Sequence, residues 1–171
     1  SSIHPFAPQE QTVGYQEMIA QLSKWLAEVT GYAAVSLQPN SGAQGEYAGL
    51  VAINRYNKSI GQRHRNICLT PTSAHGTNPA TAVMCGYKVV EIPTDKSGNV
   101  DMAALKAAVG PQTAGLMLTN PSTLGVFEEN VSEMSRVVHE VGGLLYYDGA
   151  NLNAVLGKVK PGDMGFDVIH I

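Results

Sequence analysis

The turn at residues 40–45 (NSGAQG) is the first stretch that could do chemistry, because it combines small residues with hydroxyl and amide groups just before an expected helix. The first N–H groups of a helix are free and its dipole is positive there, so the turn predicts an anion site. It matches neither GxGxxG nor GxxxxGK(S/T), which argues against a dinucleotide or P-loop site. A plain Asn/Ser helix cap is the alternative.

A histidine and an aspartate follow two further expected strands. His75 stands between small residues (SAHGT), so its imidazole is expected to be unobstructed in the same cleft, with a structural histidine as the alternative. Asp148 ends the apolar run GGLLYY, where an unpaired charge would be costly. It should therefore meet a cation or several donors, and an ordinary Asp-Gly turn is the alternative. The turn at residues 120–125 (NPSTLG) offers hydroxyl and amide donors but no acid.

Alternating strands and helices must position these residues. The expected strands are continuous apolar runs, typical of a parallel sheet buried on both faces: 67–70, 88–92, 115–119, 144–147 and 167–171. The expected helices are 42–57, 78–84, 101–109 and 131–141, with Asp101 as an N-cap. A short strand at 33–37 is expected before the NSGAQG turn. This alternation predicts a doubly wound α/β domain that binds ligands beyond the carboxyl ends of its strands.

An amphipathic helix precedes this domain. From residue 16, apolar residues fall on one helical face, namely Met18, Ile19, Leu22, Trp25, Leu26 and Val29. Gly31 is placed to end the helix. Residues 1–32 are therefore expected to form an N-terminal segment and helix that lead into a large domain over residues 33–171.

Composition favours one globular α/β domain and excludes several function classes. The 171 residues are 44% hydrophobic and 15% charged, with 18 glycines, which suits tight turns around a sizeable core. The net charge of -3 gives no basic footprint for nucleic acid. No apolar run approaches the roughly 20 residues that a membrane span needs. Cys68 and Cys85 lack metal-ligand spacing, so no metal site is predicted.

The three candidate groups fit a single cofactor. An anion cradle, a planar imidazole and a buried carboxylate match the phosphate, the ring and the pyridine nitrogen of pyridoxal phosphate. The carboxylate would keep the nitrogen protonated, and the protonated ring is what makes this cofactor an electron sink.

Five motifs carry a resemblance that spans nearly the whole chain: QPNSGAQGEYAGL, SAHGTNPA, NPSTLGVFEE, DGANLNA and DVIHI. In this order they resemble the C-terminal, catalytic half of the glycine decarboxylase P-protein family of the glycine cleavage system. IHPFAPQEQTVGY near the start also fits. The resemblance implies the large domain of a fold-type-I pyridoxal-phosphate enzyme, with a mostly parallel sheet and helices on both faces.

The resemblance also implies roles for individual residues. The cofactor phosphate would be bound by Ser41, Gly42, Ala43 and Gln44. His75 would stack on the ring, Asp148 would pair with the pyridinium nitrogen, and Ala150 would support the opposite ring face. Thr123 would lie near the ring hydroxyl or the substrate carboxylate. His75 and Asp148 are the implied catalytic residues.

In this family a lysine holds the cofactor covalently, and no lysine of this chain fits that role. The seven lysines are Lys24, Lys58, Lys88, Lys96, Lys106, Lys158 and Lys160. Lys158 and Lys160 follow Asp148 but precede the last expected strand, whereas the family's lysine comes just after that strand. We therefore expect the chain to be an excerpt that stops short of the lysine, and to be inactive alone.

The implied activity is that of a pyridoxal-phosphate-dependent glycine dehydrogenase (aminomethyl-transferring), an oxidoreductase of glycine catabolism. It decarboxylates glycine and transfers the aminomethyl group to the lipoyl group of a carrier protein, the H-protein. The implied assembly is a homodimer or a two-subunit enzyme, in a bacterial cytoplasm or a mitochondrial matrix. Two alternatives stay open: another fold-type-I enzyme, such as a cysteine desulfurase or amino-acid decarboxylase, and a non-catalytic paralogue that serves assembly.

Overall fold

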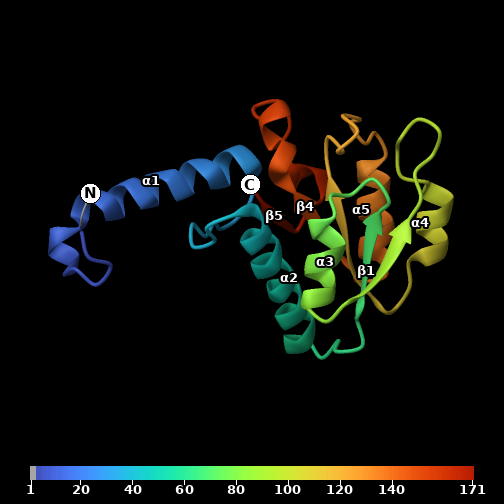
Figure 1. The fold of residues 1–171 in the computed structure, drawn as a ribbon, viewed down its shortest axis with the longest axis horizontal. Helices are drawn as coiled ribbons and strands as arrows, with labels where there is room; N and C mark the ends of the chain where they lie inside the picture. Colours follow the sequence, from blue (N-terminus) through green and yellow to red (C-terminus); the bar gives the residue numbers. More distant parts are fainter. Residues whose placement is uncertain (1–2) are drawn as a thin grey trace.

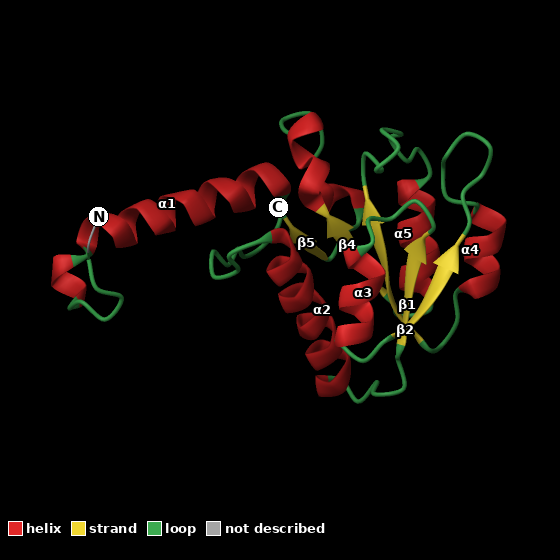
Figure 2. Cartoon of the chain, in the orientation of Figure 1, coloured by secondary structure: helices red, strands yellow, loops and turns green. Residues whose placement is uncertain are grey.

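Five strands form one parallel sheet in the computed structural model, which describes residues 3–171 (Figure 1, Figure 2). The strands are β1 (Ile67–Pro71), β2 (Lys88–Ile92), β3 (Thr113–Thr119), β4 (Leu144–Asp148) and β5 (Val168–His170). Their spatial order is β2-β1-β3-β4-β5, and all neighbours pair in parallel. The strands predicted at these places are confirmed, with ends that differ by at most two residues.

Helices cover both faces of the sheet. They are α2 (Gly42–Ser59), α3 (Thr77–Met84), α4 (Met102–Ala108) and α5 (Val131–Glu140). α2 and α3 pack over a core that includes Ile53 and Met117, and α4 and α5 pack over a core that includes Leu116 and Met134. Neighbouring residues of β3 thus serve opposite cores, because side chains alternate along a strand. The predicted doubly wound α/β fold is confirmed.

Local sequence explains where α4 begins and which face α2 buries. Asp101 is the N-cap of α4, and its carboxylate accepts hydrogen bonds from the N–H groups of Ala103 and Ala104 at 2.9 and 3.0 Å, as predicted. α2 buries one stripe of residues spaced three or four apart: Glu46, Leu50, Ile53 and Asn57. Two of these four are polar, so this helix carries more than packing into the interior.

α1 (Val13–Thr30) extends away from the sheet as an arm (Figure 1). Gly31 ends it at a φ of 80°, a left-handed conformation that favours glycine, as predicted. Within residues 3–171 the apolar face of α1 is largely open to solvent, with exposed fractions of 57% for Met18 and 58% for Trp25.

Short 3-10 helices occupy three places in the described part of the chain: η1 (Gln9–Gln11), η2 (Gly149–Ala154) and η3 (Pro161–Met164). η2 follows β4 directly, so the chain turns sharply just after Asp148. None of the helices in residues 3–171 is long and apolar enough to cross a membrane.

The strand predicted at residues 33–37 is wrong. These residues run as a loop between α1 and α2 and pair with no strand of the described chain. An apolar run forms a strand where a neighbouring strand forms hydrogen bonds with its backbone N–H and C=O groups. Here no strand within residues 3–171 does so, and the run instead borders a cavity of about 710 Å³ together with β5.

Candidate functional site

Three of the predicted site residues follow strands whose carboxyl ends lie at one edge of the sheet. β1, β3 and β4 are adjacent and parallel, so the loops that follow them emerge together. His75 lies after β1, Thr123 after β3, and Asp148 is the last residue of β4. The first turn of α2 reaches the same edge beside His170 of β5.

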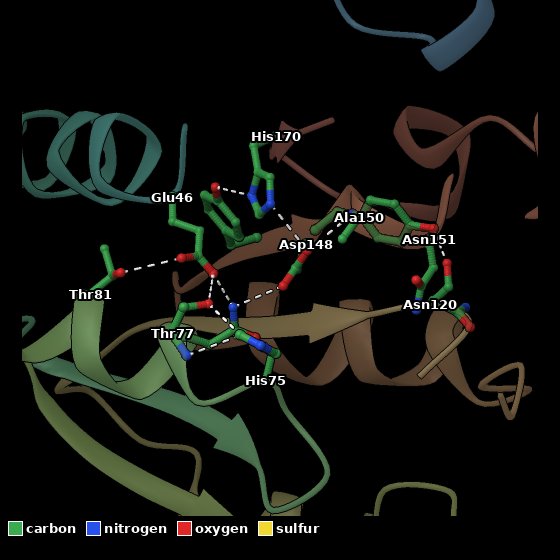
Figure 3. Close-up of polar contacts among 12 residues, drawn as sticks. Glu46, His75, Thr77, Thr81, Asn120, Asp148, Ala150, Asn151 and His170 are labelled. Carbon is green, nitrogen blue, oxygen red and sulfur yellow. Dashed lines mark hydrogen bonds and ion pairs between the residues drawn. The ribbon is translucent and has the colours of Figure 1, made fainter. Parts of the chain in front are cut away.

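Asp148 is the centre of a buried polar network (Figure 3). Its exposed fraction is 4%. Its Oδ1 accepts from the N–H of Ala150 at 3.1 Å and lies 3.1 Å from Nε2 of His170. Its Oδ2 accepts from the side-chain amide of Asn78 at 2.9 Å. An ionised carboxylate has about four lone-pair sites, so within the described residues one site on Oδ2 is still available.

These donors keep Asp148 ionised. Burial raises the pKa of this carboxyl, but the hydrogen bonds from His170, Asn78 and the Ala150 N–H, with the charge of His170, lower it by more, to about 2. The expectation that a buried charge at this position meets several donors is confirmed.

His170 links Asp148 to a tyrosine. Its Nδ1 lies 2.8 Å from the phenol oxygen of Tyr146, which is fully buried. Burial first, and then the charges of Glu46 and Asp148, raise the pKa of Tyr146, so the phenol keeps its proton. The phenol of Tyr146 thus holds the Nδ1 edge of the His170 ring, and the Nε2 edge faces Asp148.

The NSGAQG turn both caps α2 and keeps free donors. Oγ of Ser41 accepts from the N–H of Gln44 at 3.3 Å, and the side-chain oxygen of Gln44 accepts from the N–H of Asn40 at 2.8 Å. The helix-cap alternative therefore holds. Gly42 and Ala43 lie in the first turn, where N–H groups have no carbonyl partner within the helix, and both are exposed. Two N–H groups and the positive end of the helix dipole remain for an anion.

Glycine brings α2 close to His170. A Cβ on Gly45 would lie 2.7 Å from Cβ of His170, and a Cβ on Gly42 would lie 3.5 Å from its Nε2. Because glycine has no side chain, the NSGAQG turn can lie beside His170, which contacts Asp148.

The predicted residues fall into two groups, of which one borders the cavity. Ser41 and Gly42 border it, together with His170 from β5. His75 and Asp148 are not among its lining residues. His170 is thus the structural link between the anion turn and the carboxylate, since it contacts both the cavity and Asp148.

His75 is exposed and is anchored by the start of α3. Its Nδ1 lies 2.8 Å from the hydroxyl oxygen of Thr77 and accepts a hydrogen bond from the backbone N–H of Thr77 at 3.3 Å. The imidazole is therefore accessible on its Nε2 side and held on its Nδ1 side.

Thr123 and Ala150 lie beside these two groups. The hydroxyl of Thr123 donates to the backbone carbonyl of Ser73, so the loop after β3 is tied to the loop that carries His75. Ala150 is exposed, and its N–H donates to Asp148. The structure places Thr123 near the His75 loop and Ala150 next to the carboxylate.

A second buried carboxylate, Glu46, completes the network. Its exposed fraction is 1%. Its Oε1 accepts from the hydroxyl of Thr77 at 3.1 Å and from the amide of Asn78. Its Oε2 accepts from the hydroxyl of Thr81 at 3.3 Å. Asn78 therefore bridges two carboxylates, Glu46 on α2 and Asp148 on β4.

Sequence reasoning missed Glu46, Asn78 and His170. Glu46 stands in the buried stripe of α2, and His170 interrupts the apolar strand VIHI, so each is a polar residue within an apolar pattern. Asn78 gives no such signal, because Asn is common at helix starts. One ligand atom each from Glu46, Asp148 and His170 lie within 4.8 Å of one another. Protein hydrogen bonds already engage these groups, which favours a hydrogen-bonded network over a metal site.

The chain is similar to known proteins along nearly its whole length. Residues 41–171 match the sequence profile of the family described as "Aminotransferase class-V". A protein of Nitrosospira multiformis named "Probable glycine dehydrogenase (decarboxylating) subunit 2" is 69% identical over 168 residues, which are 98% of this chain and 34% of that protein. The "Glycine dehydrogenase (decarboxylating)" of Nostoc punctiforme is 58% identical over 172 residues, which cover 99% of this chain and 18% of that protein. The chain thus spans about a third of the first relative's length and under a fifth of the second's.

A solved structure titled as glycine decarboxylase (P-protein) of the glycine cleavage system, in inhibitor-bound form, has the same fold. It superposes with a TM-score of 0.80 at 20% identity and covers 99% of this chain and 36% of that chain. A sphingosine-1-phosphate lyase of Burkholderia pseudomallei superposes with a TM-score of 0.72 at 16% identity, over 94% of this chain and 41% of that one. At these identities the likeness concerns the fold alone.

Proposed function

This chain belongs to the aminotransferase class-V family, and we propose that it forms part of the cofactor-binding domain of a pyridoxal-phosphate-dependent glycine dehydrogenase (decarboxylating). The resemblance of its motifs to the glycine decarboxylase P-protein family is confirmed by relatives at 69% and 58% identity. Because the chain spans about a third of the first relative's length, the activity is that of a longer protein. A protein of the relatives' length that contains this chain is called the full-length protein below.

The observation that carries the proposal is the hydrogen-bonded carboxylate of Asp148. The pyridine nitrogen of pyridoxal phosphate needs an anion beside it, because the anion keeps that nitrogen protonated. Asp148 stays ionised, with a pKa of about 2, and its Oδ2 has a lone-pair site that the described residues do not use. A carboxylate of this kind fits the ring nitrogen.

The NSGAQG turn fits the cofactor phosphate. It contains no Arg or Lys, so the negative charge would be met by the N–H groups of Gly42 and Ala43, by the helix dipole and by the hydroxyl of Ser41. That hydroxyl accepts from Gln44 and still has its own proton to donate. Gln44 supports the turn through its bond to Asn40.

The remaining predicted residues would hold the ring and the substrate. His75, with its Nδ1 edge anchored and its ring exposed, would stack on one ring face. Ala150 would support the other face, and Thr123 would serve the ring hydroxyl or the substrate carboxylate from the neighbouring loop.

The chemistry follows from this arrangement. When bound, pyridoxal phosphate supplies an electron sink for the electron pair that remains when glycine loses its carboxyl group as carbon dioxide. Asp148 would hold the proton at the ring nitrogen, while His170 and Asn78 hold Asp148. The remaining aminomethyl group would pass to the disulfide of a lipoyl group on a carrier protein, the H-protein, which is reduced in that transfer. Glycine as substrate rests on the relatives' names.

One relative supports the proposal that the full-length protein works as part of a two-subunit bacterial enzyme. The protein at 69% identity is named as a subunit 2, and the relatives quoted above are bacterial. No observation favours a non-catalytic paralogue, since His75 and Asp148 are both present. Another fold-type-I enzyme is supported by fold likeness alone.

The test is carbon dioxide release by the full-length protein, with its second subunit if it has one. Glycine labelled at the carboxyl carbon should give labelled carbon dioxide that depends on both pyridoxal phosphate and a lipoylated carrier. A protein that binds the cofactor but acts on cysteine or another amino acid instead of glycine would overturn the substrate. A protein that does not bind pyridoxal phosphate would overturn the whole proposal.

A further inference from the structure

The contact between His170 and Asp148 depends on the register in which β5 pairs with β4. The two residues are partners in that pairing, and Nε2 of His170 lies 3.1 Å from Oδ1 of Asp148 (Figure 3). Side chains alternate between the two faces of a sheet, so a shift of one residue would turn His170 to the other face. Within residues 3–171, β5 is three residues long and pairs with β4 alone, so few backbone hydrogen bonds fix this register.

The packing of β5 shows which face each of its residues occupies. Val168 packs against the core under α2 and α3, and His170 lies against Gly45 of α2. Ile169 packs against the core under α4 and α5. A shift of one residue would therefore place the imidazole in an apolar core and would leave Asp148 without this partner.

Asp167, the residue before β5, marks where the pairing begins. Its backbone N–H donates to the carbonyl oxygen of Leu145 at 2.9 Å, and its Oδ2 accepts from the N–H of Leu145 at 2.7 Å. One residue thus forms hydrogen bonds with both backbone groups of Leu145. The carboxylate does for this N–H what a carbonyl group of the neighbouring strand does in a regular ladder, so the ladder has a defined first step.

His139 of α5 holds the carboxylate of Asp167. Its Nε2 lies 2.8 Å from Oδ2 of Asp167, and its Nδ1 lies 3.2 Å from Oγ of Ser135, one turn earlier on the same helix. Oγ of Ser135 also lies 3.3 Å from the carbonyl oxygen of Gly165. Two residues of α5 therefore contact the segment 165–167 that leads into β5. The side chains of His139 and Asp167 are 37% and 32% exposed, so their contact acts through geometry more than through charge energy.

We propose that Asp167 and His139 are positioning residues for the cofactor site, which fix the pairing of β5 on β4 and thereby place His170 beside Asp148. The inference rests on the proposed function, because Asp148 is the residue proposed to hold the proton at the ring nitrogen. It makes residues near the amino ends of β4 and β5 responsible for a contact at the carboxyl ends of the same strands. It also predicts that Asp167 affects the cofactor only when His170 is present.

The central variant is Asp167→Ala in the full-length protein, and Asp101→Ala is its matched control. The carboxylate of Asp101 also accepts from the backbone, namely from the N–H groups of Ala103 and Ala104 at 2.9 and 3.0 Å, but it does so at the start of α4. Both changes remove a carboxylate that binds backbone N–H groups at the start of an element. Thermal unfolding measures the loss of stability in each.

The first measurement needs no cofactor. Hydrogen–deuterium exchange of the apoprotein, read by mass spectrometry, reports how often the backbone N–H groups of residues 166–170 open to solvent. We expect exchange there to be about tenfold faster in Asp167→Ala than in the parent, as for the loss of one or two hydrogen bonds, and parental in Asp101→Ala. Parental exchange over residues 166–170 in Asp167→Ala would overturn the proposal.

The second measurement is a double-mutant cycle on the affinity for pyridoxal phosphate, with His170→Leu as the second change. Leu fills the space of the imidazole but removes both ring nitrogens. Asp167→Ala should weaken cofactor binding about tenfold in the parent and less than about twofold in the His170→Leu background, while Asp101→Ala should change it less than about twofold in both. An equal loss in the two backgrounds would show that Asp167 supports the fold without placing His170. Parental affinity in Asp167→Ala would likewise overturn the proposal.

His139→Ala guards against an Asp167→Ala protein that does not fold. It keeps both bonds between Asp167 and Leu145, removes the contact from α5, and introduces a good helix former. We expect cofactor binding to weaken about threefold, again only where His170 is present, and exchange over residues 166–170 to rise. Parental affinity together with parental exchange would show that α5 does not hold β5, which would overturn the proposal.

His64→Ala, at an exposed histidine in the turn before β1, is the control for His139→Ala and should match the parent in both measurements. If the parent itself failed to bind pyridoxal phosphate, the proposed function would fail. The exchange measurement would still decide whether Asp167 and His139 hold β5 on β4.

Discussion

Asp148 and Glu46 are two buried carboxylates with different surroundings. Asp148 has His170 beside it and a lone-pair site that the described residues leave open, whereas Glu46 accepts bonds on both oxygens from neutral groups of α3. Asp148 is therefore suited to meet a proton-bearing ligand, and Glu46 is suited to hold protein groups in place. The difference lies in their partners, because both are nearly inaccessible to solvent.

The change Asp148→Asn should keep the fold and cripple decarboxylation in the full-length protein. An amide cannot hold a proton on the ring nitrogen, so the electron sink weakens, and loss of such electrostatic stabilisation commonly costs on the order of 10²–10³ in rate. The turnover of glycine with a lipoylated carrier measures the effect. Asp163→Asn, at an exposed aspartate of η3, is the control and should retain parental turnover. Near-parental turnover in Asp148→Asn would contradict the assigned role.

Asp148 should also make stability depend on pH in acid. Its pKa lies at about 2 in the folded protein against an ordinary 3.8. Because the folded value is the lower one, the ionised carboxylate stabilises the fold at pH values above about 4, and this contribution is lost as the pH falls toward 2. The difference corresponds to about 2 kcal/mol.

The measurement is urea unfolding of the full-length parent and of Asp148→Asn at pH 6 and pH 3. The free energy of unfolding should differ between the two proteins at pH 6, and the difference should shrink at pH 3. A difference that is the same at both pH values would show that Asp148 is not held below its ordinary pKa.

Residues such as Asp148 could be selected from the sequence because a charged group at the end of an apolar run demands donors. The identities of those donors could not be predicted. Asn78 lies 70 residues from Asp148 in the chain, and their contact depends on how β1 and β4 are spaced by β3. Glu46 meets α3 for the same reason, since two helices on one face of the sheet bring it there.

At the scale of elements, the N-terminal end of α2 is capped by side chains and also presents free N–H groups. Its first turn is closed by Ser41 and Gln44 and still presents two free N–H groups, while glycines let it approach β5. Because the cap is built from side chains, the backbone N–H groups of the next residues stay free to donate. The start of this helix can therefore hold an anion without a basic residue.

The change Ser41→Ala should weaken binding of pyridoxal phosphate to the full-length protein by roughly 1.5–3 kcal/mol, as for one hydrogen bond to a charged group. Gly42→Val should weaken it more, because a β-branched side chain would occupy the space of the phosphate and restrict the backbone that presents the N–H groups. A cofactor titration of both variants measures this.

Ser41→Ala also removes the helix cap, which costs about 1 kcal/mol of stability. Thermal unfolding measures that loss of stability separately from the loss of cofactor affinity. Gly42→Val serves as the comparison, because it leaves the Ser41 cap in place. If Gly42→Val bound the cofactor as tightly as the parent, the turn would be a helix cap and the phosphate would sit elsewhere.

The strands and helices could be predicted because each is marked by a local pattern, such as the continuous apolar run of β3 or the cap at Asp101. The run at 33–37 has the same local pattern as a short strand, but it borders the cavity and pairs with no strand of the described chain. Whether an apolar run joins a sheet depends on the place of its neighbours in space, which no local pattern records. The direction in which α1 projects could not be predicted for the same reason.

At the scale of the whole molecule, the full-length protein should hold pyridoxal phosphate on a lysine outside residues 1–171. The seven lysines of this chain do not match the family's position. Borohydride reduction of the cofactor-loaded full-length protein, followed by peptide mapping, should locate the cofactor on one lysine beyond β5. Recovery of the cofactor on Lys158 or Lys160, which precede β5, would contradict the prediction.

The central place of β3 shapes how the domain can be assembled during translation. β3 lies between β1 and β4, although it follows β2 in the chain. As synthesis proceeds from the N-terminus, β1 and β2 leave the ribosome first, and the edge of β1 that β3 will occupy then exposes unpaired N–H and C=O groups. The bond between Asn78 and Asp148 has to wait until β4 has emerged. A nascent chain that pauses before β4 has covered that edge of β1 with β3, but it still exposes the edge of β3 that β4 will occupy, and it lacks Asp148.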